Sequence, residues 1–255
     1  AGLALADDAD AIAQDHLLRA IGRAGVVEPP RPPREPVDRA SLHRIAVHEA
    51  GHVVAVALLL GLPWLREAHI AHTGGAIGWG PPEDGVSVMT EHQVRDGIAV
   101  ELAGMAAERL VLGGAEVPHG DARRAAALAR DLVETGLDPT VPPVDVKHPG
   151  YPGSPLATRT IEAVAALLMT GRERAYAVLA PHQGTVLALA DWFEAAVHDQ
   201  RAADPLADGA YIDGPALRER LAGIGTNPRQ GAASDPVSAT GPSAKPRAKT
   251  GTRHH

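Results

Sequence analysis

Apolar residues recur at helical spacing along most of the chain, in segments separated by glycine and proline. Positions three and four residues apart lie on the same face of an α-helix, so this pattern predicts helices with one buried side. Val94, Ile98, Leu102, Met105 and Leu110, for example, form one apolar stripe. The segments with this pattern are residues 9–24, 41–60, 90–112, 121–136, 156–179, 182–198 and 215–221.

Boundary signals support several of these helices. Ser41 is a candidate N-cap for the second helix. Thr90 and Gln93 have the spacing of a capping box, in which two side chains satisfy free backbone N–H groups at a helix start. Gly113 and Gly136 are placed to end the helices that precede them.

Strand character is confined to one short part of the chain. Residues 69–73 and 76–79 predict a pair of strands joined around Gly74 and Gly75. Residues 138–155 contain six prolines and predict a long irregular loop. Aromatic residues make up only 3% of the chain, so small aliphatic side chains must fill the core, which favours closely packed helices. The expected fold class is therefore α+β and predominantly helical, a helical bundle with a small β-element.

Proline and small polar residues mark the two ends of the predicted domain. The proline-rich stretch within residues 25–40 predicts an extended linker, which would separate a remnant helix at residues 1–24 from the rest. From residue 226 onward Gly, Ala, Ser and Pro dominate, which predicts a disordered tail over residues 226–255. The folded domain is expected over residues 41–225.

Charge and cysteine content exclude some functions. A net charge of -7 argues against nucleic acid as the main partner. Cysteine is absent, so a metal site must use His, Asp or Glu, and 13 histidines are available. The start of the chain has no signal-peptide pattern, and the apolar run at residues 53–60 is too short to cross a bilayer. We therefore expect this chain to be soluble.

Residues 48–52 read His-Glu-Ala-Gly-His and lie within a strongly apolar predicted helix. His48 and His52 are four residues apart, so both imidazoles project from nearly the same face and can bind one ion. Zinc accepts imidazole and carboxylate ligands, and Glu49 could take a proton from the attacking water and later deliver it to the leaving amine. Gly51 leaves room for another element to approach closely. The motif predicts a catalytic zinc site.

A chance occurrence of the motif in a plain helical protein is a competing interpretation. The apolar flanks Ile45, Val47, Val53 and Val54 argue against it, because two histidines and a glutamate are costly to bury without a shared partner. A third protein ligand is needed, and the residues alone leave several candidates open. The candidates are Glu108, His119, Asp121, His69 and His72.

Four blocks of the chain resemble, in the same order, the peptidase domain of FtsH-type ATP-dependent zinc proteases. The resemblance covers about residues 41–221 and, weakly, residues 9–24. The blocks are the His-Glu-x-x-His motif, the short strand at residues 76–79, the glycine-alanine-glutamate helix at residues 102–110 and the aspartate-led helix at residues 121–130. Four ordered blocks are much more specific than the zinc motif alone.

The resemblance implies that His48, His52 and Asp121 hold zinc and that Glu108 holds an imidazole in place. It also implies a free strand edge, along which a polypeptide substrate could add as an extra strand bound mainly through its backbone. The residues assigned to this edge are Ile70, Ala71, His72, Ile77 and Gly78. The resemblance further implies an ATPase module upstream, with residues 1–24 as the last helix of its lid. It also implies that the full-length protein is a homo-hexamer.

Two hypotheses about function follow. The first is a zinc-dependent endopeptidase that cleaves unfolded or delivered polypeptides on the cytoplasmic side, in a full-length protein that could carry a membrane anchor. The second is a non-catalytic interaction module that keeps the fold and the zinc. Departures from the family at residues 116–120 and at Arg109 motivate the second hypothesis. The intact Glu49 favours the first, because a scaffold does not need a general base.

Overall fold

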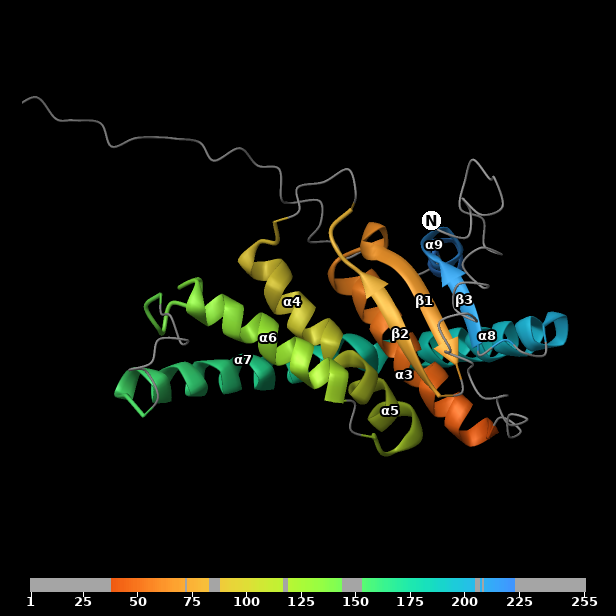
Figure 1. The fold of residues 1–255 in the computed structure, drawn as a ribbon, viewed down its shortest axis with the longest axis horizontal. Helices are drawn as coiled ribbons and strands as arrows, with labels where there is room; N and C mark the ends of the chain where they lie inside the picture. The colour runs from red at the N-terminus through yellow and green to blue at the C-terminus, as the bar shows by residue number, and fades with distance from the viewer. Residues whose placement is uncertain are drawn as a thin grey trace, which may run out of the picture. The chain divides into compact units, whose positions relative to one another are not determined.

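A computed structural model describes residues 38–222 apart from 72, 83–87, 117–118, 144–152, 205–206 and 208 (Figure 1). The helix expected over residues 1–24, nearly all of the linker, the tail expected over residues 226–255 and His72 lie outside the described residues. The described part consists mainly of helices with one small antiparallel sheet, which confirms the α+β class.

The helices are α3 (Arg39–Leu59), α4 (Glu91–Glu101), α5 (Ala103–Leu112), α6 (His119–Glu134), α7 (Pro155–Leu179), α8 (Gln183–Ala203) and α9 (Gly214–Leu221). The strands are β1 (Leu65–Ala71), β2 (Gly74–Trp79) and β3 (Gly209–Asp213). Short 3-10 turns, η1 (Leu62–Trp64) and η2 (Ala180–His182), precede β1 and α8.

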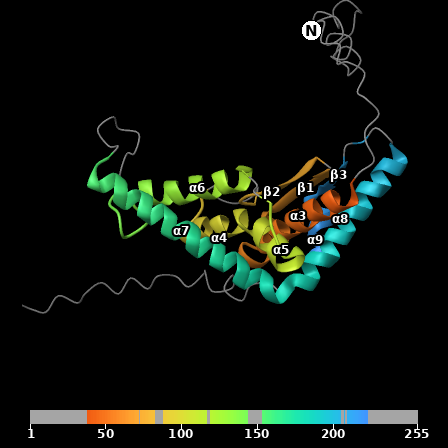
Figure 2. The ribbon, with the colours of Figure 1, turned by 90° about the horizontal axis from the view of Figure 1, so that it is seen from below.

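Helix α3 is the core helix of the domain, with α5 and α8 packed against it and the sheet lying over it (Figures 1 and 2). Every residue from Ala46 to Ala57 is buried. The helix begins at Arg39, so Ser41 lies in its first turn and is not the N-cap that the sequence suggested. Among the described residues α3 alone is long and apolar enough to cross a membrane, but 78% of its apolar stretch is buried inside the domain.

A break at Leu102 divides the helix expected over residues 90–112 into α4 and α5. The predicted capping box is present: Thr90 Oγ1 accepts a hydrogen bond from the Gln93 N–H, and Gln93 Oε1 accepts one from the Thr90 N–H. Gly113, with φ of 75°, ends α5 as predicted. The break lets α5 pack across α3 while α4 packs against α6 and α7.

Helix α6 packs through a cluster of buried apolar side chains that it shares with α4 and α7. The most deeply buried side chains of this cluster include Ile98 of α4 and Leu132 of α6. The helix begins at His119, so Asp121 lies in its first turn rather than at its start. This packing sets the position at which the first turn of α6 meets α3.

The sheet has the strand order β2-β1-β3, with both pairs antiparallel. Strand β3 was not expected from the sequence, and its pairing with β1 makes β1 the central strand. Ile70 and Ala71 are paired on both sides, so the expectation that they offer a free strand edge is wrong. Ile77 and Gly78 lie on β2, which is an edge strand among the described residues.

Candidate metal centre

Helix α3 brings its two motif histidines together in the interior. His48 and His52 are both buried, with only 9% and 5% of their surfaces exposed. Their rings lie edge to face with centroids 4.8 Å apart, and their Nε2 atoms are 3.1 Å apart. The one-turn spacing of the motif accounts for this arrangement.

The other ring nitrogens of these histidines have separate partners. His48 Nδ1–H donates to Glu108 Oε1 at 2.7 Å, and His52 Nδ1–H donates to the Val100 carbonyl at 2.7 Å. Glu108 is itself fixed, because its Oε2 accepts hydrogen bonds from Arg44 and from the Glu116 N–H. These contacts orient both rings and leave both Nε2 atoms directed at one point.

Asp121, from the first turn of α6, supplies the third atom at this point. Its Oδ2 lies 2.8 Å from His48 Nε2 and 3.4 Å from His52 Nε2. Of the other third-ligand candidates, Glu108 contacts the opposite side of the His48 ring. His69 is exposed on β1. His72 and the side chain of His119 lie outside the described residues.

The three atoms fit the requirements of a tetrahedral zinc ion. Zinc-to-ligand bonds of about 2.0–2.1 Å place tetrahedral ligand atoms about 3.3 Å from one another. The separations among the two Nε2 atoms and Asp121 Oδ2 run from 2.8 to 3.4 Å. Two imidazoles and a carboxylate are a donor set that zinc accepts, with a fourth position open for water or substrate.

The electrostatics of the group are those of a cation site. Burial disfavours the protonated form of His48, but hydrogen bonds to the carboxylates of Asp121 and Glu108 outweigh it and raise the pKa of His48 to about 9. Burial works toward a higher pKa for Asp121, yet its hydrogen bonds to His48 and His52 lower that pKa well below its ordinary value. The site therefore holds a positive charge in place, either a proton or a metal ion.

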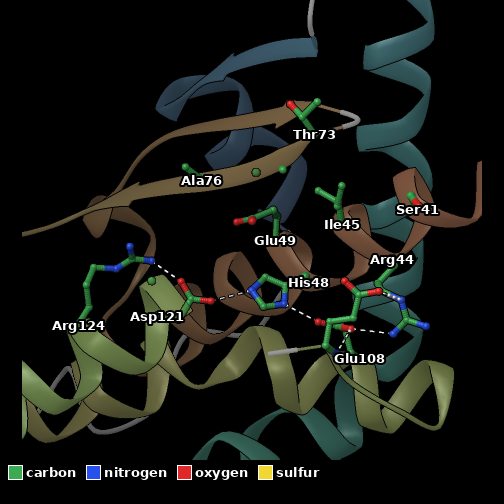
Figure 3. Close-up of a pocket in the computed structure, with 14 residues that line it drawn as sticks. Ser41, Arg44, Ile45, His48, Glu49, Thr73, Ala76, Glu108, Asp121 and Arg124 are labelled. Carbon is green, nitrogen blue, oxygen red and sulfur yellow. Dashed lines mark hydrogen bonds and ion pairs between the residues drawn. The ribbon is translucent and has the colours of Figure 1, made fainter. Parts of the chain in front are cut away.

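Glu49 is buried one residue further around α3, with 6% of its surface exposed. Its carboxylate lies beside His48 and Asp121 and beneath β2 (Figure 3). Burial raises the pKa of Glu49, and the neighbouring imidazoles of His52 and His48 oppose that rise. A carboxylate with a raised pKa is a better proton acceptor near neutral pH.

These side chains open onto a cavity of about 500 Å³ between α3, β2 and the first turn of α6 (Figure 3). Arg44 lines one end and Arg124 the other, and the segment Thr73–Ala76 forms the wall opposite α3. His48, Glu49 and Asp121 all line this cavity.

Two glycines allow the helices around the site to approach each other. A β-carbon on Gly104 of α5 would lie 2.6 Å from His48 Cδ2. A β-carbon on Gly51 would lie 2.5 Å from Ala107 Cβ and 2.8 Å from the Ala103 carbonyl oxygen. The close approach predicted from Gly51 is thus confirmed, and the role of Gly104 was not foreseen.

Besides Arg44, which donates to Glu108, the sequence interpretation missed two charged residues at the site. Arg124 contacts the second oxygen of Asp121, and Glu101 of α4 contacts Arg124. The i, i+3 spacing from Asp121 to Arg124 on a predicted helix was a signal that could have indicated the first contact. No local pattern indicates Glu101, because it comes from another helix.

Comparison with known proteins agrees with this geometry. The sequence model described as Peptidase family M41 matches residues 36–192. The chain belongs to peptidase family M41. The match includes the whole of the metal centre, from α3 to the first turn of α6, and it confirms the resemblance that the sequence blocks indicated.

Several curated relatives of this M41 chain are named ATP-dependent zinc metalloprotease FtsH. FtsH 1 of Sorangium cellulosum is 42% identical over 94 residues, which cover 35% of this chain and 15% of the relative. FtsH of Hahella chejuensis is 32% identical over 140 residues, or 53% and 21% of the two chains. FtsH of Acidothermus cellulolyticus is 33% identical over 165 residues, or 58% and 25%. The matched segments thus span a quarter or less of each relative's length.

Proposed function

We propose that this M41 chain is a zinc-dependent endopeptidase domain acting on unfolded polypeptides. The observation that carries the proposal is the convergence of three ligand atoms, from His48, His52 and Asp121, on one point. The buried Glu49 carboxylate lies beside that point and faces an open cavity. The names of the relatives, all zinc metalloproteases, support zinc as the metal.

The chemistry follows from what each group can do. Zinc, when bound, lowers the pKa of a water to about 7 and polarises the scissile carbonyl. Glu49 takes the proton of the attacking water at its carboxylate, for which its raised pKa suits it. The same carboxyl then delivers the proton to the nitrogen of the leaving amine. The hydrogen bonds at Nδ1 of His48 and His52 keep both rings in the binding orientation.

Strand β2 is the proposed docking edge for substrate. It pairs with β1 on one side only among the described residues, so backbone groups near Ile77 and Gly78 can pair with an extended polypeptide. Recognition through the backbone accepts many sequences but requires an extended chain. Folded proteins therefore have to be unfolded before they can be cleaved.

We further propose that the domain is the proteolytic part of an ATP-dependent protease. The relatives are named as ATP-dependent, and the segments matched here are a quarter or less of their length. An ATPase module in the same assembly would deliver unfolded substrate to the cavity, and the assembly is proposed to be a homo-hexamer.

The test is cleavage of a permanently unfolded protein by the zinc-loaded wild type and by Glu49→Gln, side by side. The substitution keeps the side-chain volume and removes the proton acceptor, so cleavage should fall by at least about 100-fold. The exposed Glu162 of α7 provides a control, because Glu162→Gln makes the same chemical change far along the chain. Zinc content is measured for all three proteins.

Zinc bound by all three proteins, with cleavage lost in Glu49→Gln alone, would support the proposal. Equal cleavage by the wild type and Glu49→Gln would contradict the role of Glu49. Zinc binding without cleavage by the wild type, in assembled hexamers as well as in this chain, would favour the interaction module.

A further inference from the structure

Asp121 uses its two carboxylate oxygens for different partners. Oδ2 faces the two histidine Nε2 atoms, while Oδ1 accepts a hydrogen bond from the guanidinium of Arg124, one turn along α6 (Figure 3). An aspartate side chain has two torsions and could otherwise turn either oxygen toward the metal point. The contact with Arg124 selects one orientation.

Arg124 is itself held on its other side. Its Nε–H donates to Glu101 Oε2 at 2.7 Å. Glu101, the last residue of α4, is only 5% exposed, and its Oε1 accepts a hydrogen bond from Trp79 Nε1–H at 3.1 Å. Each oxygen of this buried carboxylate thus has one donor, as a charge away from water requires. The guanidinium is fixed between two carboxylates.

We propose that Arg124 is a positioning residue for the metal centre: it holds Asp121 so that Oδ2 alone faces the ion, and Glu101 sets the guanidinium for this task. The inference rests on the proposed zinc site. Partners that orient a ligand contribute about 10- to 100-fold to metal affinity or activity. Trp79 belongs to β2, so the same series of hydrogen bonds connects β2, the proposed docking edge for substrate, to the third ligand, Asp121.

A surface ion pair is the plain alternative for Arg124, whose side chain is 59% exposed. Exposed ion pairs contribute little to stability and nothing specific to a metal site. The two interpretations differ in what Glu101 does. If Arg124 acts through Asp121 and Glu101 acts through Arg124, removing Glu101 lowers the zinc affinity only while Arg124 is present.

The experiment measures zinc affinity, by competition with a chromophoric chelator, for the wild type, Arg124→Gln, Glu101→Gln and the double variant. Arg124→Gln should weaken zinc binding by about 10- to 100-fold. Glu101→Gln should weaken it less. Trp79 and Arg124 donate to different oxygens of Glu101, and in glutamine one of these positions is an NH2 group, which cannot accept. The double variant should match Arg124→Gln alone.

Arg130→Gln is the control on the same helix, because the Arg130 side chain is 55% exposed and its Nε lies 4.0 Å from Glu134 Oε1. It should bind zinc like the wild type. Circular dichroism of the metal-free proteins checks the fold. If Arg124→Gln fails to fold, Arg124→Lys replaces it: one ammonium cannot bridge both carboxylates in the same geometry, so an intermediate loss is expected.

Zinc affinity within about twofold of the wild type in the folded Arg124 variant would overturn this inference and leave the zinc site intact. Losses that simply add in the double variant would overturn the part assigned to Glu101. Failure of the wild type itself to bind zinc would instead contradict the proposed function.

Discussion

The backbone of Gly75 lies directly against the side chain of Glu49. A β-carbon at position 75 would come within 2.5 Å of Glu49 Cγ and 2.6 Å of Oε1. Strand β2 can lie over the general-base candidate only because residue 75 has no side chain. Strand β2 and the proton acceptor are therefore in direct contact, which contributes to the burial of Glu49.

Gly75→Ala is expected to lower peptidase activity without loss of fold or zinc. The atoms in the way belong to the flexible Glu49 side chain, so the carboxylate moves rather than the strand. A displacement of about 1 Å is enough to reduce turnover by about 100-fold. Activity, zinc content and thermal unfolding are measured together. Gly184→Ala is the control, because nothing lies within 4 Å of its added carbon.

Gly104→Ala should weaken zinc binding, whereas Gly75→Ala should leave zinc bound and lower only the activity. The added carbon would meet the His48 ring, 2.5 Å from Cε1 and 2.6 Å from Cδ2. The ring is held by Glu108 and cannot yield without breaking that hydrogen bond. We expect zinc affinity to fall by at least about tenfold. Wild-type zinc affinity in a folded Gly104→Ala protein would contradict this placement of the ring.

The metal motif could be predicted from sequence because its geometry is local. His48 and His52 are one turn apart on a single helix, so periodicity alone places their rings together. The third ligand is different, since Asp121 comes from α6 and reaches the site only through the packing of α6 on α4 and α7. Local pattern left Asp121 among five candidates, and only the family resemblance distinguished it.

Strand β3 could not be predicted from the sequence. Its five residues alternate in burial, but a run this short is also compatible with a loop. Its partner β1 lies about 140 positions earlier, and no local signal encodes such a pairing. Missing β3 led directly to the wrong assignment of Ile70 and Ala71 as edge residues.

Gly51→Ala is predicted to lower the stability of the fold rather than to impair the catalytic groups. The added carbon would lie 2.8 Å from the Ala103 carbonyl oxygen, and a backbone atom cannot move aside cheaply. Overpacking of this kind lowers the free energy of unfolding by about 1–3 kcal/mol. Chemical denaturation of the zinc-free protein measures the change, with Gly184→Ala expected to shift it by no more than ~1 kcal/mol. A neutral Gly51→Ala would mean that α5 is free to move away from α3.

The stability of the zinc-free protein should depend on pH in a way set by the metal ligands. The pKa of His48 is raised from 6.5 to about 9, so its protonated form stabilises the fold. This contribution is complete below about pH 6.5 and is lost as the pH rises toward 9. The pKa values of Asp121 and Glu108 are lowered, so their contributions are present above their ordinary values of 3.8 and 4.5 and are lost as the pH falls.

The zinc-free protein is therefore expected to be most stable between about pH 5 and 6.5, and zinc should reverse the alkaline part of this profile. Zinc binds neutral imidazole, so its stabilising effect should grow from pH 6 to 9 as the His48 proton becomes easier to displace. Thermal unfolding with chelator and with zinc at several pH values measures both trends. His48→Gln should reduce the alkaline decline to the part that comes from the raised pKa of Glu49, and the exposed His69→Gln should keep all of it. A zinc-free wild type whose stability is unchanged from pH 6.5 to 9 would contradict the carboxylate contacts assigned to His48.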